Sequence, residues 1–381
     1  MAMTHRERVE RALSFREGDR PPIALFGTAN RITNPLYFEL LKLLDLTGTG
    51  IKDRPGKTAE YTDHRIADLF GVDFRHVIAR YPEKKEKNLR QEAVDAEFFD
   101  EWGCGYKLVG PYPTMVYHPL AEASRDAIDS YPFPNPAAPE RILGLAEEAR
   151  HWYEDTDYYV TAMSPISGLA MDFCFYLRGQ EQFLCDMYLD ETFAHHLLDK
   201  VSDVIAELYA FYIAPIAPYI GWVEFESDYG LQDSLLLPVE KYREFIKEPN
   251  EKVFRAVKRV APDVKLFLHS CGAVRELIPE FIAGGIDILQ SLQPRAAGMD
   301  SLSLKKEFGS ELVFHGGLDL QGGMNGTREE AIDEALRRLD AFSPGGGYIF
   351  GPSNHLQPDT PAENLVAVYE TAQRYTTGGR G

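Results

Sequence analysis

A histidine and a cysteine two positions apart, His269 and Cys271, are the residues of this chain best suited to chemistry. They end the apolar run LFLHSCG (266–272), which is typical of a buried strand. At this spacing both side chains can point to the same side of the backbone, and imidazole with thiolate is a ligand set that zinc prefers. Because zinc needs at least a third protein ligand, the pair alone is not a site, and without further context a buried thiol beside a hydrogen-bonded histidine is the simpler interpretation.

The composition indicates a large folded protein and excludes disordered and membrane-spanning classes. Of the 381 residues, 44% are hydrophobic and 26% are charged. No apolar run reaches the roughly 18 residues that a membrane span requires. The amino-terminal stretch MAMTHRERVERAL lacks the apolar core and cleavage site of a signal peptide, so we expect a cytoplasmic protein.

The net charge limits the kinds of molecule that the protein can bind, and the spacing of the cysteines indicates their redox state. The formal net charge of -19 repels phosphate backbones, and no Lys/Arg cluster offsets it, which argues against a nucleic-acid partner and favours a small-molecule substrate. The 4 cysteines are scattered over the chain, so we interpret them as reduced thiols rather than a disulfide framework.

Short apolar runs rich in β-branched and aromatic residues alternate with stretches of helical periodicity. The predicted strands are 23–26, 74–79, 158–162, 222–226, 265–269, 286–289, 312–315 and 348–350. The predicted helices include 35–45, 139–153, 180–213, 238–260, 274–283, 327–342 and 361–375. This alternation predicts an α/β fold, a single TIM-type (β/α)8 barrel over residues 1–381. A doubly wound open sheet is the alternative, but no glycine fingerprint follows the first run.

One region, 84–117, interrupts the alternation. It is polar, turn-rich and aromatic, and it has no helical period. We predict a β-hairpin insertion after the second strand.

In a TIM-type barrel the chemistry lies where the strands end, so the polar residues that follow the predicted strands are the candidates for a site. The residues that end or follow a predicted strand are Arg31, Glu226, Ser227, Asp228, His269, Cys271, Gln290, His315, Asp319, Asn354 and His355, and Asp73 lies near the second predicted strand. Such a ring suits a polar or ionisable substrate. Structural alternatives exist, because Asp319 can cap the segment after it, and Glu226 and Asp228 can be solvated carboxylates.

The order of several segments resembles the uroporphyrinogen decarboxylase superfamily. These segments are RERVERAL, FES, HSCG, HGGLD and GPSNHLQPDTPAEN, and the resemblance covers nearly the whole chain. It implies a single TIM-type barrel. The superfamily contains two chemistries: metal-free decarboxylation of the acetate arms of a tetrapyrrole, and zinc-dependent methyl transfer between a corrinoid and a thiol or pterin acceptor.

The decarboxylase branch is matched in part. Its Arg-Gln-Ala-Gly-Arg-Tyr motif corresponds to 26–32, where only Arg31 remains of two carboxylate-binding arginines. Its active-site tyrosine aligns with Phe175, its pyrrole-binding aspartate can match Asp73, and its Phe-Glu-Ser serine matches Ser227. The substitutions argue against a tetrapyrrole with many carboxylates as the substrate.

The methyltransferase branch has a His-x-Cys pair after the fifth strand, which His269 and Cys271 match. Its third zinc ligand is a cysteine after the last strand, where this chain has Asn354. His355 or Glu226 is then the candidate third ligand, and the last candidate is His315.

The resulting hypothesis is a zinc-dependent methyltransferase that moves a methyl group between a corrinoid (cobalamin) carrier and a thiol or a tetrahydrofolate-like pterin. The residues are assigned as metal ligands (His269, Cys271 and His355), catalytic acids or bases (Glu226 and Asp228), and substrate-binding residues (Arg31, Asp73, Ser227, Gln290, His315, Asp319 and Asn354). A separate corrinoid protein and a homodimer are the partners that the resemblance implies. Two alternatives stay open: a metal-free decarboxylase of a smaller carboxylated substrate, and a non-catalytic corrinoid- or tetrapyrrole-binding protein.

Overall fold

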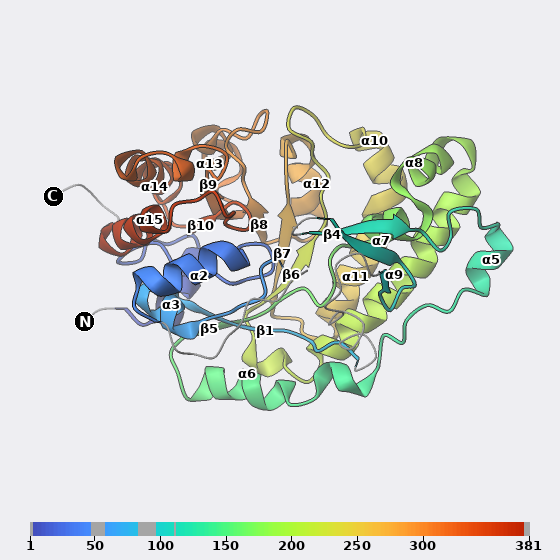
Figure 1. Cartoon of the computed structure of the whole chain (residues 1–381), viewed down its shortest axis with the longest axis horizontal. Helices are drawn as coiled ribbons and strands as arrows, with labels where there is room; N and C mark the ends of the chain where they lie inside the picture. The colour runs from blue at the N-terminus through green and yellow to red at the C-terminus, as the bar shows by residue number, and fades with distance from the viewer. Residues whose placement is uncertain (1–2, 47–57, 83–96, 110–111, 377–381) are drawn as a thin grey trace.

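A computed structural model describes residues 3–46, 58–82, 97–109 and 112–376 of the chain (Figure 1). Its main feature is a 7-stranded parallel sheet in the order β1-β5-β6-β7-β8-β9-β10. The strands are β1 (Phe74–Val77), β5 (Tyr159–Ala162), β6 (Trp222–Glu226), β7 (Lys265–Ser270), β8 (Ile288–Ser291), β9 (Val313–Leu318) and β10 (Tyr348–Pro352). Each of them overlaps a predicted strand. The sheet curls in the manner of a TIM-type barrel.

Helices connect the strands and lie around the outside of the sheet (Figure 1). They are α1 (His5–Leu13), α2 (Asn34–Leu43), α3 (His64–Leu69), α5 (Arg125–Asp129), α6 (Leu145–Glu154), α7 (Ala170–Arg178), α8 (Gln180–Leu189), α9 (Glu191–Ile213), α10 (Val239–Lys241), α11 (Lys247–Val260), α12 (Ile278–Ala283), α13 (Ser301–Phe308), α14 (Arg328–Phe342) and α15 (Ala362–Arg374). Since helices cover one face of the strands and barrel side chains fill the other, β5, β8, β9 and β10 are buried at every position. None of the described helices combines the length and the apolarity needed to cross a lipid bilayer.

The long helix predicted for 180–213 is two helices, α8 and α9. Asp190 separates them and accepts a hydrogen bond from the Phe193 N–H, so its side chain caps the start of α9. An aspartate is a favoured cap because its carboxylate satisfies a backbone donor that the helix leaves free. The break lets the second helix take its own direction.

The first predicted strand, 23–26, is instead reduced to a single parallel bridge between Ile23 and Phe350. The Ala24 N–H donates to the Phe350 carbonyl, and the Phe350 N–H donates to the Pro22 carbonyl. On the other side the Asp73 N–H donates to the Ile23 carbonyl. Residues 22–24 therefore lie between β10 and β1, in the place of an eighth strand, and we call this closure the seam.

Two local features keep the seam short. Pro21 and Pro22 have no N–H to donate to a neighbouring strand. Phe26 has a left-handed φ of 71°, which turns the chain away shortly after the bridge. A regular strand over 23–26 is therefore not formed.

The insertion between β1 and β5 is a 3-stranded antiparallel sheet. It consists of β2 (Phe98–Phe99), β3 (Gly105–Val109) and β4 (Tyr112–Tyr117) in that order. The predicted hairpin corresponds to β3 and β4, and β2 adds a third strand that the sequence did not predict. Residues 84–96 and 110–111 of the predicted insertion lie outside the described residues.

Candidate functional site

A pocket of about 230 Å³ lies at the carboxyl ends of the parallel strands, where the sequence predicted a site. Of the predicted residues it is lined by Glu226, Ser227, Asp228, His269, Asn354 and His355. Asp172 and Tyr176 of α7 also line it, and sequence reasoning did not propose either residue. The pocket therefore combines the ends of β6, β7 and β10 with one face of α7.

Three predicted residues bring potential metal-ligand atoms together. One atom each of Asp228, His269 and Cys271 lies within 4.8 Å of the others. The Nε2 atom of His269 is 3.6 Å from Asp228 Oδ1 and 3.3 Å from Cys271 Sγ. A set of sulfur, nitrogen and oxygen from three residues suits a zinc site that leaves a fourth position for substrate.

Gln290 determines which nitrogen of His269 faces this cluster. The Gln290 side-chain N–H groups donate to the carbonyls of Pro352 and Ser353, each at 3.3 Å, so its Oε1 faces His269 Nδ1. Nδ1 must therefore carry a proton, and Nε2 is the atom available to a metal. Gln290 thus orients His269, and it does not line the pocket as a substrate-binding residue would.

The protonation of His269 depends on its neighbours. Burial lowers its pKa, but the adjacent Cys271 sulfur and Asp228 outweigh burial and raise the pKa to about 10. In a metal-free protein Nε2 therefore holds a proton. A metal at this position would displace that proton, as is usual when imidazole becomes a ligand.

Cys271 Sγ is surrounded by hydrogen-bond donors. Asn354 Nδ2 lies 3.1 Å from the sulfur and Ser291 Oγ lies 3.7 Å from it. The Oδ1 of Asn354 accepts the His355 N–H at 2.6 Å, which directs the amide nitrogen to the sulfur. Asn354 therefore supplies a donor to Cys271, not a third metal ligand.

His355 lines the pocket but lies outside the cluster of ligand atoms in the described structure. Its Nδ1 accepts the Arg31 N–H at 3.1 Å, so the proton of the neutral ring is on Nε2. Burial lowers its pKa to about 4, which keeps the ring neutral near pH 7. Neither nitrogen then has a free lone pair for a metal, and among the described residues it is Asp228, not His355, that lies beside His269 and Cys271.

Two acids of the pocket hold their protons unusually tightly. Burial raises the pKa of Glu226 to about 8 and that of Asp172 to about 7. The Leu169 N–H donates to Asp172 Oδ2 at 2.9 Å, which places this carboxyl at the start of α7. Near neutral pH both groups can therefore give or take a proton. A single acid in the apolar segment 169–177 was the sequence signal for Asp172.

Tyr176 changes the interpretation of α7. The alignment placed an active-site tyrosine at Phe175, whose ring instead packs on Phe183 with 6.0 Å between centroids. Tyr176, the next residue, lines the pocket. Because one step along a helix rotates a side chain by roughly 100°, an error of one position moves it off the pocket wall.

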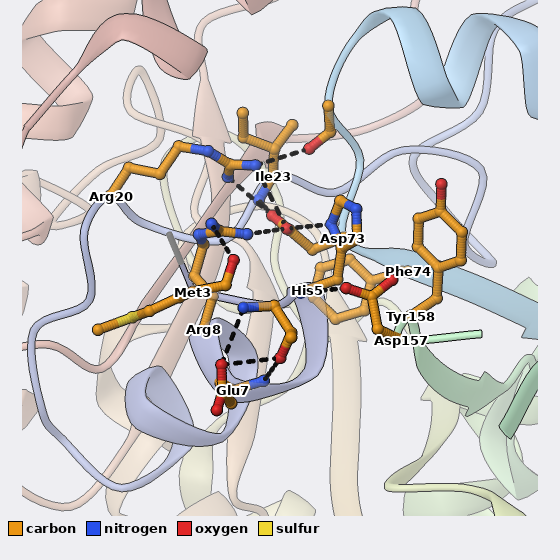
Figure 2. A network of polar contacts seen from close by, with 12 residues as sticks. Met3, His5, Glu7, Arg8, Arg20, Ile23, Asp73, Phe74, Asp157 and Tyr158 are labelled. Atoms are coloured by element: carbon orange, nitrogen blue, oxygen red, sulfur yellow. Dashed lines mark hydrogen bonds and ion pairs between the residues drawn. The ribbon is translucent and has the colours of Figure 1, made fainter. Parts of the chain in front are cut away.

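Asp73 lies at the end of the barrel opposite to the pocket, which contradicts its predicted role in binding substrate. Figure 2 shows the polar network around its carboxylate. Asp73 precedes β1, and its side chain is fully buried. Its carboxylate accepts hydrogen bonds from His5, Arg8, Arg20 and the Ile23 N–H at 2.6–2.8 Å. Burial raises the pKa of Asp73, but these partners outweigh it and the pKa is lowered. Asp73 therefore fastens α1 and the seam.

Three further predicted substrate-binding residues do not line the pocket. Arg31 Nη2 donates to the Glu60 carbonyl and to Thr62 Oγ1, both at 2.9 Å. The structure instead uses the Arg31 backbone, through its hydrogen bond to His355.

Asp319 and His315 are also turned to structural roles. The Asp319 carboxylate binds Arg295 at 2.8 Å and caps the N–H groups of Gln321 and Gly323. His315 is buried in the barrel with its ring edge-on to Phe267, and burial lowers its pKa to about 3. Its ring is therefore neutral near pH 7, and it does not face the pocket as a catalytic base would.

Residues 104–375, more than half of the chain, match the protein family described as uroporphyrinogen decarboxylase (URO-D). This chain belongs to the uroporphyrinogen decarboxylase family. Among relatives in this family, the uroporphyrinogen decarboxylase of Nostoc punctiforme is 27% identical over 194 residues, 50% of each chain. That of Rickettsia felis is 30% identical over 141 residues, 37% of this chain and 38% of the relative. The chain thus spans about half the length, or less, of these relatives.

A solved structure with the same fold is a methyltransferase from Methanosarcina mazei. The two structures have a TM-score of 0.67 and 16% sequence identity, and the match covers 97% of this chain and 98% of the other. At this identity the likeness shows the fold alone. In this member of the uroporphyrinogen decarboxylase family, the residues of the pocket, and not the fold, determine the chemistry.

Proposed function

We propose that this member of the uroporphyrinogen decarboxylase family is a zinc-dependent methyltransferase acting between a corrinoid carrier and a thiol or pterin acceptor. The convergence of Asp228, His269 and Cys271 carries the proposal. The orientation of His269 by Gln290 supports it, because Nε2 is then directed at the other two ligand atoms. Zinc, when bound, would hold a thiol acceptor as a strongly nucleophilic thiolate.

The remaining residues of the pocket have roles that do not depend on a metal. Asp172 and Glu226 can accept a proton from the acceptor or return one to it, since burial brings both pKa values close to neutral. His355 can donate its Nε2–H to an oxygen or nitrogen of the bound molecule. A pterin suits this set, because its ring presents donors and acceptors along one edge.

The charge of the pocket argues against a substrate with many carboxylates. Asp172, Glu226 and Asp228 line it, and no Arg or Lys lines the part that the structure describes. Carboxylate substrates are normally held by paired cationic donors, and three acids would repel them. Uroporphyrinogen is therefore a poor fit to these residues.

The metal-free decarboxylase remains the second candidate, and the protonated acids are the observation that favours it. When a carboxylate leaves as CO2, its bonding electron pair stays on carbon, and a carboxylic acid must protonate that carbon. Asp172 or Glu226 could supply this proton near neutral pH. A substrate with a single carboxylate and a cationic group would be compatible with the charge of the pocket.

Metal content tests the choice. We expect elemental analysis of protein purified without added metal to give about one zinc per chain. Cys271→Ser should lose it, whereas Cys185→Ser should keep it, because Cys185 is an exposed cysteine that does not belong to the cluster of ligand atoms. A wild-type protein without metal, even after zinc supplementation, would overturn the proposal and leave the decarboxylase. Turnover that survives in wild type but not in Cys271→Ser would exclude a purely binding role.

A corrinoid protein that docks at the pocket and a homodimer stay predictions for the same protein. Both follow from the family resemblance. Size measurement in solution, with and without a corrinoid protein, addresses them directly.

A further inference from the structure

Strand β8 ends in an unusual backbone conformation beside the proposed metal site. Ser291 has a φ of 121° and Leu292 a φ of 56°. Residues with a Cβ rarely adopt positive φ, because the side chain crowds the neighbouring peptide groups. Strain of this kind persists only where the surrounding structure enforces it, and it occurs most often at functional sites.

The neighbouring strand shows how the same bend can be made without strain. Ser291 pairs in register with Gly316 of β9. Gly316 has a φ of 95° and Gly317 a φ of 92°, so both strands turn through positive φ at the same level of the sheet. Glycine carries this conformation at no steric cost in β9. In β8 a serine is present where glycine would be the easier residue.

The hydroxyl of Ser291 has a partner that explains its presence. Ser291 is fully buried, and its Oγ donates to Cys271 Sγ at 3.7 Å. Asn354 Nδ2 lies 3.1 Å from the same sulfur, and the Cys271 N–H donates to Asp228 Oδ1 at 2.8 Å. Side chains from β8 and from the segment after β10 thus donate hydrogen bonds to the sulfur. The backbone N–H of Cys271 donates to Asp228, which is a proposed ligand of the same metal.

We propose that Ser291 is a positioning residue for Cys271, and that its hydroxyl fixes the sulfur and withdraws charge from it when it binds a metal. The proposal rests on the proposed zinc site. Hydrogen bonds to a ligating atom orient that atom and tune its donation to the metal, and their loss typically lowers metal affinity about 10–100-fold. Since the contact from oxygen to sulfur is long, we expect a change near the lower limit.

Two substitutions separate the hydroxyl from the backbone strain. Ser291→Ala removes the hydroxyl and keeps the Cβ, so the strained φ remains. Ser291→Gly removes both, so the positive φ becomes unstrained. Ser343→Ala is the matched control, because Ser343 is also a buried serine but its Oγ has no hydrogen-bond partner in the described structure.

The measurements are zinc affinity by competition with a chromophoric chelator, the absorption of the cobalt(II)-substituted protein, and the thermal midpoint. We expect both Ser291 variants to bind zinc about tenfold more weakly. Their sulfur-to-cobalt charge-transfer band should move to longer wavelength, because a sulfur without this hydrogen bond gives up its electron more easily. Only Ser291→Gly should gain a higher thermal midpoint. Ser343→Ala should leave affinity and absorption unchanged.

The outcomes distinguish a failure of the role proposed for Ser291 from a failure of the proposed zinc site. If wild type binds zinc and Ser291→Ala has the same affinity and the same cobalt band, Ser291 has no positioning role. If wild type takes up neither zinc nor cobalt, the zinc site itself fails, and the inference fails with it. Because Ser291→Gly relieves strain, misfolding of Ser291→Ala would not prevent the test.

Discussion

The two histidines of the pocket differ in the hydrogen bond that Nδ1 makes: it donates in His269 and accepts in His355. His269 commits Nδ1 as a donor to Gln290, which leaves Nε2 for a metal. His355 commits Nδ1 as an acceptor from the Arg31 backbone, which leaves Nε2 as an N–H donor. The same side chain therefore serves as a ligand in one place and as a substrate contact in the other.

This difference gives a prediction for zinc content. His269→Ala should lose zinc, whereas His355→Ala should keep about one zinc per chain and weaken substrate binding, seen as a raised KM. Elemental analysis and steady-state kinetics on the two variants check it. Loss of zinc from His355→Ala with an intact fold by circular dichroism would restore His355 as the third ligand.

The buried carboxyl of Asp172 predicts a pH dependence of stability. Its pKa is raised from 3.8 to about 7 in the folded protein, chiefly by burial. Between these values the folded state keeps a proton that the unfolded state releases, so Asp172 lowers stability as pH rises. The limit is about 1.4 kcal/mol per pH unit.

Asp172→Asn cannot ionise, so its free energy of unfolding relative to wild type should increase between pH 5 and pH 8, by roughly 2–4 kcal/mol. Urea unfolding at the two pH values measures the change. Asp126→Asn, which replaces an exposed acid, should show no such gain. Parallel pH profiles of wild type and Asp172→Asn would show that Asp172 is ionised in the folded protein.

At the scale of elements, the turn after β7 is held against the loop after β6 by direct backbone contact. Gly272 has a φ of +83°, and a Cβ there would collide with the backbone of Gly230 and Leu231. The Ala273 N–H donates to the Leu231 carbonyl at 2.8 Å. This contact keeps Cys271 and Asp228 close to each other.

Gly272→Ala should therefore abolish zinc binding and lower stability. The control is Gly285→Ala, because Gly285 has a similar φ of +89° but open space around its Cβ position. It carries the strain of positive φ, about 1–2 kcal/mol, without the collision. Both variants should have lowered thermal midpoints, but zinc should be lost only in Gly272→Ala. Equal zinc content in the two would show that the close approach is not required.

Most of the strands, and the proposed ligand pair, could be predicted from the sequence. Apolar periodicity located the 7 strands of the sheet because burial on both faces leaves a continuous local signal. The signal for the proposed ligand pair was equally local, since His269 and Cys271 are two positions apart in sequence and their side chains lie 3.3 Å apart. The strand 23–26 failed because a bridge depends on its partner, Phe350, and on the left-handed Phe26.

The errors in the predicted site concern the end of the strand at which a residue lies and the face of the helix to which a residue belongs. Asp73 comes before β1, so it lies at the opposite end of the barrel from residues that follow strands. Phe175 was one helical step from Tyr176. Asp228 was predicted as a catalytic acid or base, and sequence alone shows neither its position beside His269 and Cys271 nor the hydrogen bond from the Arg31 backbone to His355.

In the molecule as a whole, one buried carboxylate connects the amino-terminal segment to the seam at which the barrel closes. Asp73 binds Arg8 and Arg20 of the amino-terminal segment and the Ile23 N–H of the seam (Figure 2). Removing one partner from a buried ionic network leaves the other charges uncompensated, which typically costs about 3–5 kcal/mol.

Asp73→Asn should thus lower the free energy of unfolding by about this amount while leaving zinc affinity unchanged, because the pocket is at the other end of the barrel. Asp157→Asn is the control: this exposed acid contacts His5 N–H at 3.3 Å, and its loss should change stability by less than about 0.5 kcal/mol. Chemical denaturation with a zinc titration measures both quantities. A wild-type stability for Asp73→Asn would mean that the seam closes without this network.

The seam also has a consequence for the order in which the protein is made. Residues 22–24 leave the ribosome more than three hundred residues before their partner Phe350. At typical rates of synthesis, about 5–20 residues per second, the first segment waits for tens of seconds before it can pair. Asp228, His269 and Cys271 are all translated before the barrel can close. We therefore expect the three proposed metal ligands to be present in the nascent chain before the barrel closes.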